Sequence, residues 1–200
     1  MIRVSAGVVL LLSSVAVADV VNGSFEVTAL NAPGRVGIDN LSDWTASGGF
    51  SLLERGLNNI SNITAHSGEQ FVSMGHSGQS NDRLAQTIDT VAGVQYSLEF
   101  WVATIQNSTI QTVAGSAFDA ASTDLLGTVD GVVTNTTDGW VQYSVNFTAA
   151  SDRTEIELLH TVASGLANVG VDSVSVTVVP TPAAGVIAAI GLAGMTRRKR

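Results

Sequence analysis

Residues 94–102 read Val-Gln-Tyr-Ser-Leu-Glu-Phe-Trp-Val. Apolar side chains stand at every even position of this stretch, and polar ones stand at 95, 97 and 99 between them. Successive side chains of a strand point to opposite faces of a sheet, so the alternation predicts a strand with one face in a core. Residues 141–148, Val-Gln-Tyr-Ser-Val-Asn-Phe-Thr, repeat the pattern. The two stretches predict an antiparallel sheet with one buried face and one solvated face.

Similar short stretches run through the rest of the chain and predict further strands. They are Val20–Thr28, Phe50–Leu53, Gln70–Met74, Leu84–Thr90, Thr109–Phe118, Leu125–Val133, Thr154–Thr161 and Val169–Val179. Turn-forming pairs such as Ala92-Gly93 and Asp138-Gly139 separate them. No stretch between residues 19 and 179 keeps a helical period, and no βαβ pattern appears, which disfavours nucleotide-binding folds. Eight to ten short strands predict an all-β fold, a two-sheet antiparallel β-sandwich of the jelly-roll kind.

The composition fits one domain with an appendage at each end. The chain has 200 residues, of which 45% are hydrophobic, and it has no cysteine. This excludes a disulfide scaffold and any cysteine-ligated zinc or redox site. The mean hydropathy of +0.31 is high because the apolar excess lies at the two ends.

Residues 1–18 have the features of a secretory signal peptide. Arg3 gives the positive start, an apolar stretch runs from Val4 to Val15, and Ala16-Val17-Ala18 has small residues at the two positions that signal peptidase requires. We therefore expect cleavage between Ala18 and Asp19. A buried strand or a membrane anchor is the alternative, but the apolar stretch is shorter than the ~20 residues of a membrane span.

Residues 180–200 have the features of a second targeting segment. Pro180-Thr181-Pro182 interrupts regular structure, an apolar run of small residues spans 183–195, and the chain closes on Arg197, Arg198, Lys199 and Arg200. As a helix the apolar run covers about 20 Å, less than the ~30 Å hydrocarbon core of a bilayer. The terminal cations would stay on the cytoplasmic side. An ordinary tail anchor is the alternative.

This order of features resembles the PEP-CTERM sorting signal of exported bacterial proteins. The resemblance covers residues 179–200 and departs from the usual pattern at Thr181, where the family commonly has glutamate. It implies a membrane sortase (exosortase) as partner, which recognises Pro-x-Pro and removes the tail after a transient membrane contact. It also implies a location at the cell surface, the outer membrane or the extracellular matrix of a bacterium.

The segment between these two targeting segments, residues 19–179, is strongly acidic. Its basic residues are Arg35, Arg55, Arg83 and Arg153, and four cations against seventeen acids leave a formal charge of −13. Such a surface repels phosphate backbones, so nucleic acid is excluded as a partner. Acidic surfaces suit export and association with divalent cations.

A second resemblance, over residues 20–179, is to the galactose-binding-like jelly roll of several carbohydrate-binding modules. It is carried by an ordered set of segments: Asn22-Gly23-Ser24-Phe25-Glu26, Trp44, residues 66–72, residues 84–88, Val91-Ala92-Gly93, residues 96–100, Gly139-Trp140, residues 147–149 and residues 171–174. The resemblance implies a structural Ca²⁺ held by Glu26 and Asp172, with backbone carbonyls from residues 28–40 or near Glu69 completing the shell.

The residue pattern bears on this Ca²⁺ independently. Asp172 has the same parity as Val174, Val176 and Val178, so its carboxylate lies on an apolar face, which is costly unless a partner or a cation compensates. The alternative is that Asp172 caps a turn and Glu26 is solvated. A Ca²⁺ ion would tie the first strand to the last.

Among the aromatic residues, Trp101 is the candidate for ligand binding. Its parity puts it on the polar face of its strand, where an indole could stack on a sugar ring. The alternative is that it packs under a loop such as 104–110. Trp44 and Trp140 are predicted to anchor the core. Both tyrosines have inward parity, and this scarcity of exposed aromatics counts against strong sugar affinity.

The sequence contains no recognisable catalytic constellation. There is no Gly-x-Ser-x-Gly elbow, and His66, His76 and His160 lack the spacing of a metal site. Glu155 and Glu157 share a strand face, which suits a solvated surface. We therefore expect a non-enzymatic, exported surface or exopolysaccharide-associated matrix protein. The alternative is a carbohydrate-binding module that recognises an extracellular glycan.

Overall fold

The structure is a computed structural model, and it describes residues 18–27, 30, 34–38, 41–48, 51–55, 63–75, 81–105, 110–133, 139–162 and 168–180. The predicted leader up to Val17, the sorting tail from Thr181 onward and His76 lie outside the described residues. Within the described ranges, no helix is long and apolar enough to cross a membrane.

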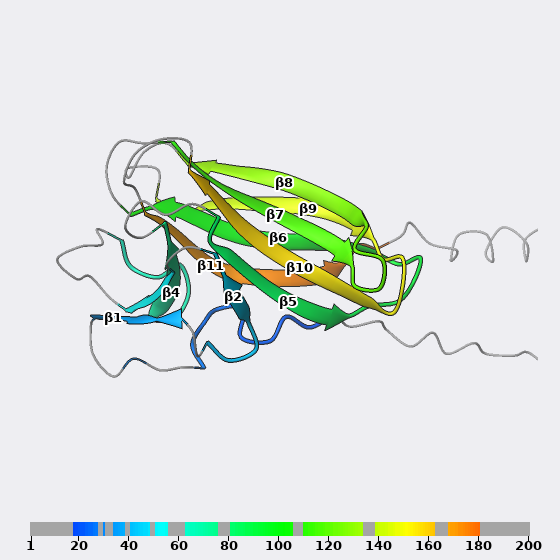
Figure 1. The fold of residues 1–200 in the computed structure, drawn as a ribbon, viewed down its shortest axis with the longest axis horizontal. Helices are drawn as coiled ribbons and strands as arrows, with labels where there is room; N and C mark the ends of the chain where they lie inside the picture. Colours follow the sequence, from blue (N-terminus) through cyan, green and yellow to red (C-terminus); the bar gives the residue numbers. More distant parts are fainter. Residues whose placement is uncertain are drawn as a thin grey trace, which may run out of the picture.

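In the described ranges, eleven strands form two antiparallel sheets that pack face to face (Figure 1). The six-stranded sheet has the order β1-β3-β4-β11-β6-β9, and the five-stranded sheet has the order β2-β5-β10-β7-β8. The strands are β1 (Gly34–Gly37), β2 (Thr45–Ser47), β3 (Leu52–Arg55), β4 (Gln70–Met74), β5 (Arg83–Asp89), β6 (Gln95–Thr104), β7 (Gln111–Asp119), β8 (Leu125–Val133), β9 (Val141–Thr148), β10 (Arg153–Val162) and β11 (Val169–Val178).

The connections from β4 onward are those of a jelly roll. β4, β11, β6 and β9 are neighbours in one sheet, while β5, β10, β7 and β8 are neighbours in the other. The chain therefore crosses between the sheets after β4, β5, β6, β8, β9 and β10, and only β7 and β8 follow each other within one sheet. The predicted fold class, an all-β two-sheet jelly-roll sandwich, is confirmed.

The segment predicted as a first strand, Val20–Thr28, is not a strand over its described residues 20–27. Asn22 and Phe25 have φ angles of 53° and 61°, which an extended strand cannot contain. The Phe25 N–H donates to the carbonyl of Asn22 at 3.1 Å and closes a turn instead. The apolar pattern reflects packing, because Phe25 is fully buried in this turn. The short strands β1 and β2 were not predicted.

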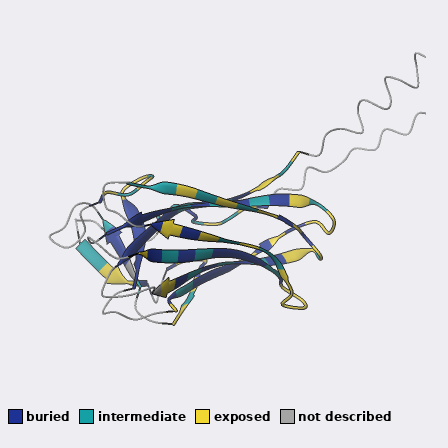
Figure 2. Ribbon diagram, turned by 90° about the horizontal axis from the view of Figure 1, so that it is seen from above, coloured by how far each residue is buried: buried dark blue, intermediate teal, exposed yellow. Residues whose placement is uncertain are grey.

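The inner faces of both sheets supply the core (Figure 2). On β6 the even positions Tyr96, Leu98, Phe100 and Val102 are fully buried, as the alternation predicts. Each such side chain contributes roughly 2 kcal/mol by leaving water. The sheets approach closely at Gly115, where a Cβ atom would lie 2.2 Å from Cε1 of Phe100.

The tryptophans have different surroundings. Trp44 is buried in the main core, tilted against Phe25, and its Nε1 donates to the carbonyl of Asn22 at 3.1 Å, so its predicted anchoring role is confirmed. Trp140 is half-buried and packs edge-to-face on Phe71 in a smaller apolar cluster outside the six-stranded sheet. It therefore does not belong to the main core.

The N-terminal segment of the described body lies at the end of the sandwich where β5 ends and β10 begins, because Asp19 lines a pocket with Asp89 and Arg153. There the N–H of Val179 donates to the carbonyl of Gln95 at 2.9 Å, which continues the β11–β6 ladder beyond its last pair. The predicted leader and the predicted sorting tail therefore both join the body at one end of the strands.

Candidate functional site

Asp172 lies on β11 at an irregularity in the pairing with β6. The register shifts between Asp172 and Ser175, and Ser173 has a φ of 52°. Because of this irregularity Asp172 lies on the face of Trp101 and not on the core face of Val174 and Val176, so the face predicted for Asp172 from parity is wrong. The carboxylate is fully buried. Its Oδ2 accepts the backbone N–H groups of His66 at 2.8 Å and Ser67 at 3.0 Å, and its Oδ1 accepts that of Ser173 at 2.6 Å.

Glu26 binds the same loop from the other side. Its Oε1 accepts the backbone N–H groups of Glu69 at 2.9 Å and Gln70 at 2.7 Å. Between the two pairs of donors stands Gly68, with a φ of 65°, and a Cβ atom there would lie 2.5 Å from Oε1 of Glu26. We call the two carboxylates and these four N–H groups the clamp. It ties the first segment of the body and the last strand to the loop that precedes β4.

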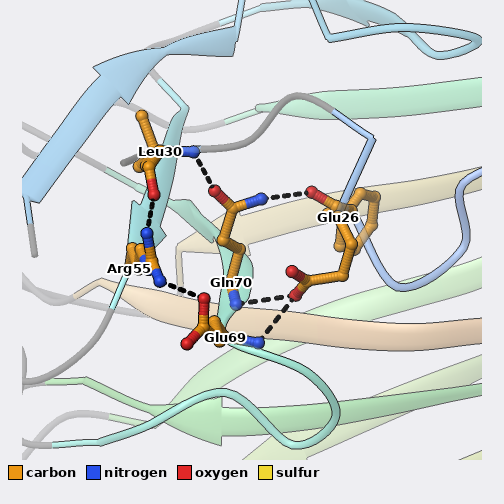
Figure 3. Close-up of polar contacts among 6 residues, drawn as sticks. Glu26, Leu30, Arg55, Glu69 and Gln70 are labelled. Carbon is orange, nitrogen blue, oxygen red and sulfur yellow. Dashed lines mark hydrogen bonds and ion pairs between the residues drawn. The ribbon is translucent and has the colours of Figure 1, made fainter. Parts of the chain in front are cut away.

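A second layer of polar contacts supports Glu26 (Figure 3). The side-chain amide of Gln70 donates to the carbonyl of Phe25 at 2.9 Å and accepts the N–H of Leu30. Arg55 donates to the carbonyl of Leu30 and forms an ion pair with Glu69. This layer engages the carbonyl of Leu30, one of the oxygens that the sequence nominated for a Ca²⁺ shell.

The two carboxylates affect each other electrostatically. Burial raises the pKa of Asp172 to about 6, its three backbone N–H donors lower it, and the charge of Glu26 raises it further. A divalent cation between them would offset this cost, so the donor chemistry fits Ca²⁺. No group of three or more His, Asp or Glu side chains that could hold a metal ion occurs in the described part of the chain. A Ca²⁺ ion at Glu26 and Asp172 would thus need backbone carbonyls to complete its shell.

Trp101 is the neighbour of Asp172 across the β6–β11 ladder. It is half-buried on the outer face of the six-stranded sheet, as its parity predicts. The ring of His66 stacks on the indole with centroids 3.9 Å apart and planes 19° apart, and it meets Trp140 edge-on at 6.1 Å. Nδ1 of His66 lies 2.8 Å from Oγ of Ser173. Residues 106–109 of the loop predicted to cover Trp101 lie outside the described residues, and what covers one indole face is His66.

Trp101 also forms part of the wall of an open hollow of about 620 Å³, which we call the Trp101 hollow. The hollow lies between the turn at residues 20–27, the irregular part of β11 and the clamp loop. Small apolar side chains, Val20, Val27 and Val174, form part of the wall. Short polar side chains and one carboxylate complete the lining: Asn22, Ser24, Ser67, Ser173, Ser175 and Glu26.

The remaining candidates from the sequence do not join this site. Glu155 and Glu157 lie together on β10 as predicted, and Arg83 of β5 forms ion pairs with both. His160 is buried in the main sandwich, where its Nε2 lies 2.7 Å from Oε1 of Gln111. These residues lie on the five-stranded sheet, whereas the clamp binds the outer side of the other sheet.

His66 is the residue of the site whose part the sequence did not reveal. It stands in a loop without periodicity, 35 positions before the indole that it covers. Only its place in the segment 66–72, which the resemblance singles out, connects it to the site.

The architecture defines a class: a two-sheet jelly roll with the fold of carbohydrate-binding modules. Residues 18–176 match the family described as "Protein of unknown function (DUF642)", and the chain belongs to that family. No curated protein matches the chain in sequence.

Three solved structures illustrate the range of proteins with this fold. A Stig cyclase from Fischerella sp. TAU, in complex with a pyrrolidinylidene-indole, has a TM-score of 0.67 at 16% identity and covers 83% of this chain and 99% of that chain. TmCBM61, in complex with β-1,4-galactotriose, has a TM-score of 0.55 at 19% identity, and the match covers 72% of this chain and 94% of that chain. An arabinose-bound α-L-arabinofuranosidase, MgGH51, has a TM-score of 0.54 at 13% identity, and the match covers 82% of this chain but 27% of that chain. The fold is thus similar both to enzymes and to a galactotriose-binding module, and the site must distinguish them.

Proposed function

We propose that this chain is an exported, non-enzymatic protein of the bacterial surface or matrix whose sandwich binds an extracellular glycan at the Trp101 hollow. The observation that carries the proposal is the half-exposed indole of Trp101, backed by His66, beside a hollow with short polar side chains. Aromatic faces stack on the C–H faces of sugar rings, and serine and asparagine side chains can donate to and accept from sugar hydroxyls.

The stacked imidazole supports this role of Trp101. His66 can cover only one of the two indole faces, and it is itself held through its backbone N–H and its ring nitrogen. An aromatic side chain fixed before binding loses little conformational entropy when a ligand arrives. The indole is therefore preorganised for a ligand on its other face.

The described residues favour binding over catalysis. The carboxylates nearest the hollow, Glu26 and Asp172, accept backbone N–H groups, and Glu155 and Glu157 on the other sheet both form ion pairs with Arg83. Acid–base hydrolysis of a glycoside needs two carboxyl groups that face one substrate from opposite sides. The sites of these four carboxylates do not have this form.

The proposal of export rests on the predicted leader and the predicted sorting tail, which join the body at the same end. The leader would direct the chain out of the cytoplasm, and the Pro180-Thr181-Pro182 tail would deliver it to an exosortase. We include a structural Ca²⁺ in the proposal: Glu26 and Asp172 would hold it, and its charge would offset that of the two carboxylates.

A glycan array tests the binding function. We expect residues 19–179 to bind at least one extracellular glycan, and we expect Trp101→Ala to abolish that binding while the thermal unfolding curve keeps its shape. Phe118→Ala is the matched control, because Phe118 is also a half-buried aromatic, on the outer face of the other sheet. Binding that survives in Trp101→Ala but is lost in Phe118→Ala would transfer the site to the five-stranded sheet.

A further inference from the structure

The charges around the Trp101 hollow bear on the chemistry of its ligand. Among its described lining residues, the one charged side chain is Glu26, which is acidic. The other polar lining groups are serine hydroxyls and the amide of Asn22, which are neutral. A carboxylate or sulfate group that entered the hollow would lose water without gaining a cationic partner.

Three of the four arginines of the body form ion pairs away from the hollow. Arg55 is paired with Glu69 and the carbonyl of Leu30, and Arg83 is paired with two glutamates on the five-stranded sheet. Arg153 lies 3.9 Å from Asp89 at the end of that same sheet. Arg35 is on the short strand β1, and none of the four lines the hollow.

The net negative charge of the whole body also disfavours an acidic ligand. Residues 19–179 carry a formal charge of −13 and no lysine. A polyanionic glycan would meet repulsion along its whole length, and at physiological ionic strength such repulsion extends about 8 Å from each charge. An uncharged glycan pays neither this cost nor the desolvation of an unpaired anion.

We infer that the Trp101 hollow selects uncharged sugar residues and rejects uronic acids and sulfated sugars. Stacking on the indole and hydrogen bonds to short hydroxyl side chains supply the attraction, and the lack of a cationic side chain among the described lining residues supplies the discrimination in the Ca²⁺-free protein. This inference rests on the proposed glycan-binding function and states the ligand class of the same site.

Matched pairs of polysaccharides test the selection. Each pair consists of a polyuronate and its carboxyl-reduced, neutral form, immobilised at equal density, so that backbone and linkage are shared. We expect residues 19–179 to bind a neutral member at least about tenfold more tightly than its acidic partner. Raising the NaCl concentration from about 0.05 M to about 0.5 M should leave neutral binding unchanged, because no ion pair forms. The whole series is run with chelator, so that a Ca²⁺ ion on Glu26, which lines the hollow, cannot act as the cationic partner of an acidic sugar.

A charge variant makes the test directional. Ser175→Arg places a cation in the hollow and should raise affinity for the acidic members. Val132→Arg, at an exposed position of β8 on the other sheet, changes the net charge equally and should not.

The outcomes separate the two levels of the claim. Equal or preferential binding of the acidic members by the wild-type protein overturns the selection while glycan binding stands. An equal gain in both arginine variants also overturns it, since the effect would then be one of net charge. If no neutral or acidic glycan binds at all, the proposed function itself fails.

Discussion

His160 is a titratable side chain inside the core and makes stability depend on pH. Its exposed fraction is 0%, Nε2 lies 2.7 Å from Oε1 of Gln111, and Nδ1 has no hydrogen-bond partner. Desolvation lowers the pKa of His160, and the charge of Asp82 opposes this shift without reversing it. The neutral imidazole is therefore the form that the fold prefers.

The sign of the pH dependence follows from that preference. Because the folded pKa lies below the unfolded value of about 6.5, the contribution of His160 is fully present above that pH and is lost as the pH falls below it. We expect the free energy of unfolding, measured with urea between pH 7.5 and pH 5, to fall more steeply in the wild type than in His160→Gln. Parallel profiles for the two proteins would contradict this assignment.

Asp172 is the residue on which the Ca²⁺ proposal depends. Replacing it by alanine leaves the N–H groups of His66, Ser67 and Ser173 without their acceptor and should cost roughly 3 kcal/mol of stability. We expect Ca²⁺ to raise the melting temperature of the wild type, chelator to lower it, and Asp172→Ala to show no response to either. Asp130→Asn, an exposed change on β8, should respond like the wild type. A wild type that is indifferent to both reagents would leave the clamp as a purely hydrogen-bonded device.

At the residue level the sequence predicts faces better than partners. Parity places Trp101 outside and Tyr96 inside, because side-chain direction in a strand is a local property. The convergence of Glu26 and Asp172 on one loop was expected from the resemblance rather than from spacing. The stack of His66 on Trp101 joins a loop to a strand, and no local pattern encodes such a contact.

The loop that carries the clamp depends on one glycine. Gly68 and Gly93 both have positive φ angles, 65° and 80°, but a Cβ atom at Gly93 would meet nothing within 4 Å, whereas at Gly68 it would collide with Glu26. Alanine at either position costs about 1 kcal/mol of backbone strain. We expect Gly68→Ala to lose more stability than this and to shift the tryptophan emission, because displacing Glu26 releases the loop whose His66 contacts Trp101 and Trp140.

Gly93→Ala isolates the strain from the collision. Its melting temperature should fall slightly and its emission spectrum should remain that of the wild type. Equal losses in both variants, with unchanged spectra, would mean that the clamp does not position the indole.

Strands were predicted well where one face is buried and the other is wet. β4, β8 and β9 match their predicted bounds to the residue. β1 and β2 have four and three residues, too few for an alternation to be visible. The apolar residues of the segment 20–27 pack against the body from a turn. Periodicity alone cannot distinguish such a segment from a strand.

Sorting is a property of the full chain, and its test needs a host that has the exosortase. We expect the double variant Pro180→Ala and Pro182→Ala to keep its tail, because the recognised Pro-x-Pro is gone. Mass spectrometry of the surface fraction measures the C-terminal cut. Thr181→Glu, which restores the residue common in the resembling family, should be processed normally. Normal processing of the double variant would refute the sorting signal.

The placement of Asp19 and Val179 at one end of the strands has a consequence for how copies of the protein would stand on a support. A molecule held through its C-terminal end would stand upright, with its strands pointing away from the attachment plane and both broad surfaces vertical. The indole then faces sideways, into the space between adjacent copies. A dense layer of such molecules would bind a polymer that passes between neighbouring copies rather than one that lies on the outer surface of the layer.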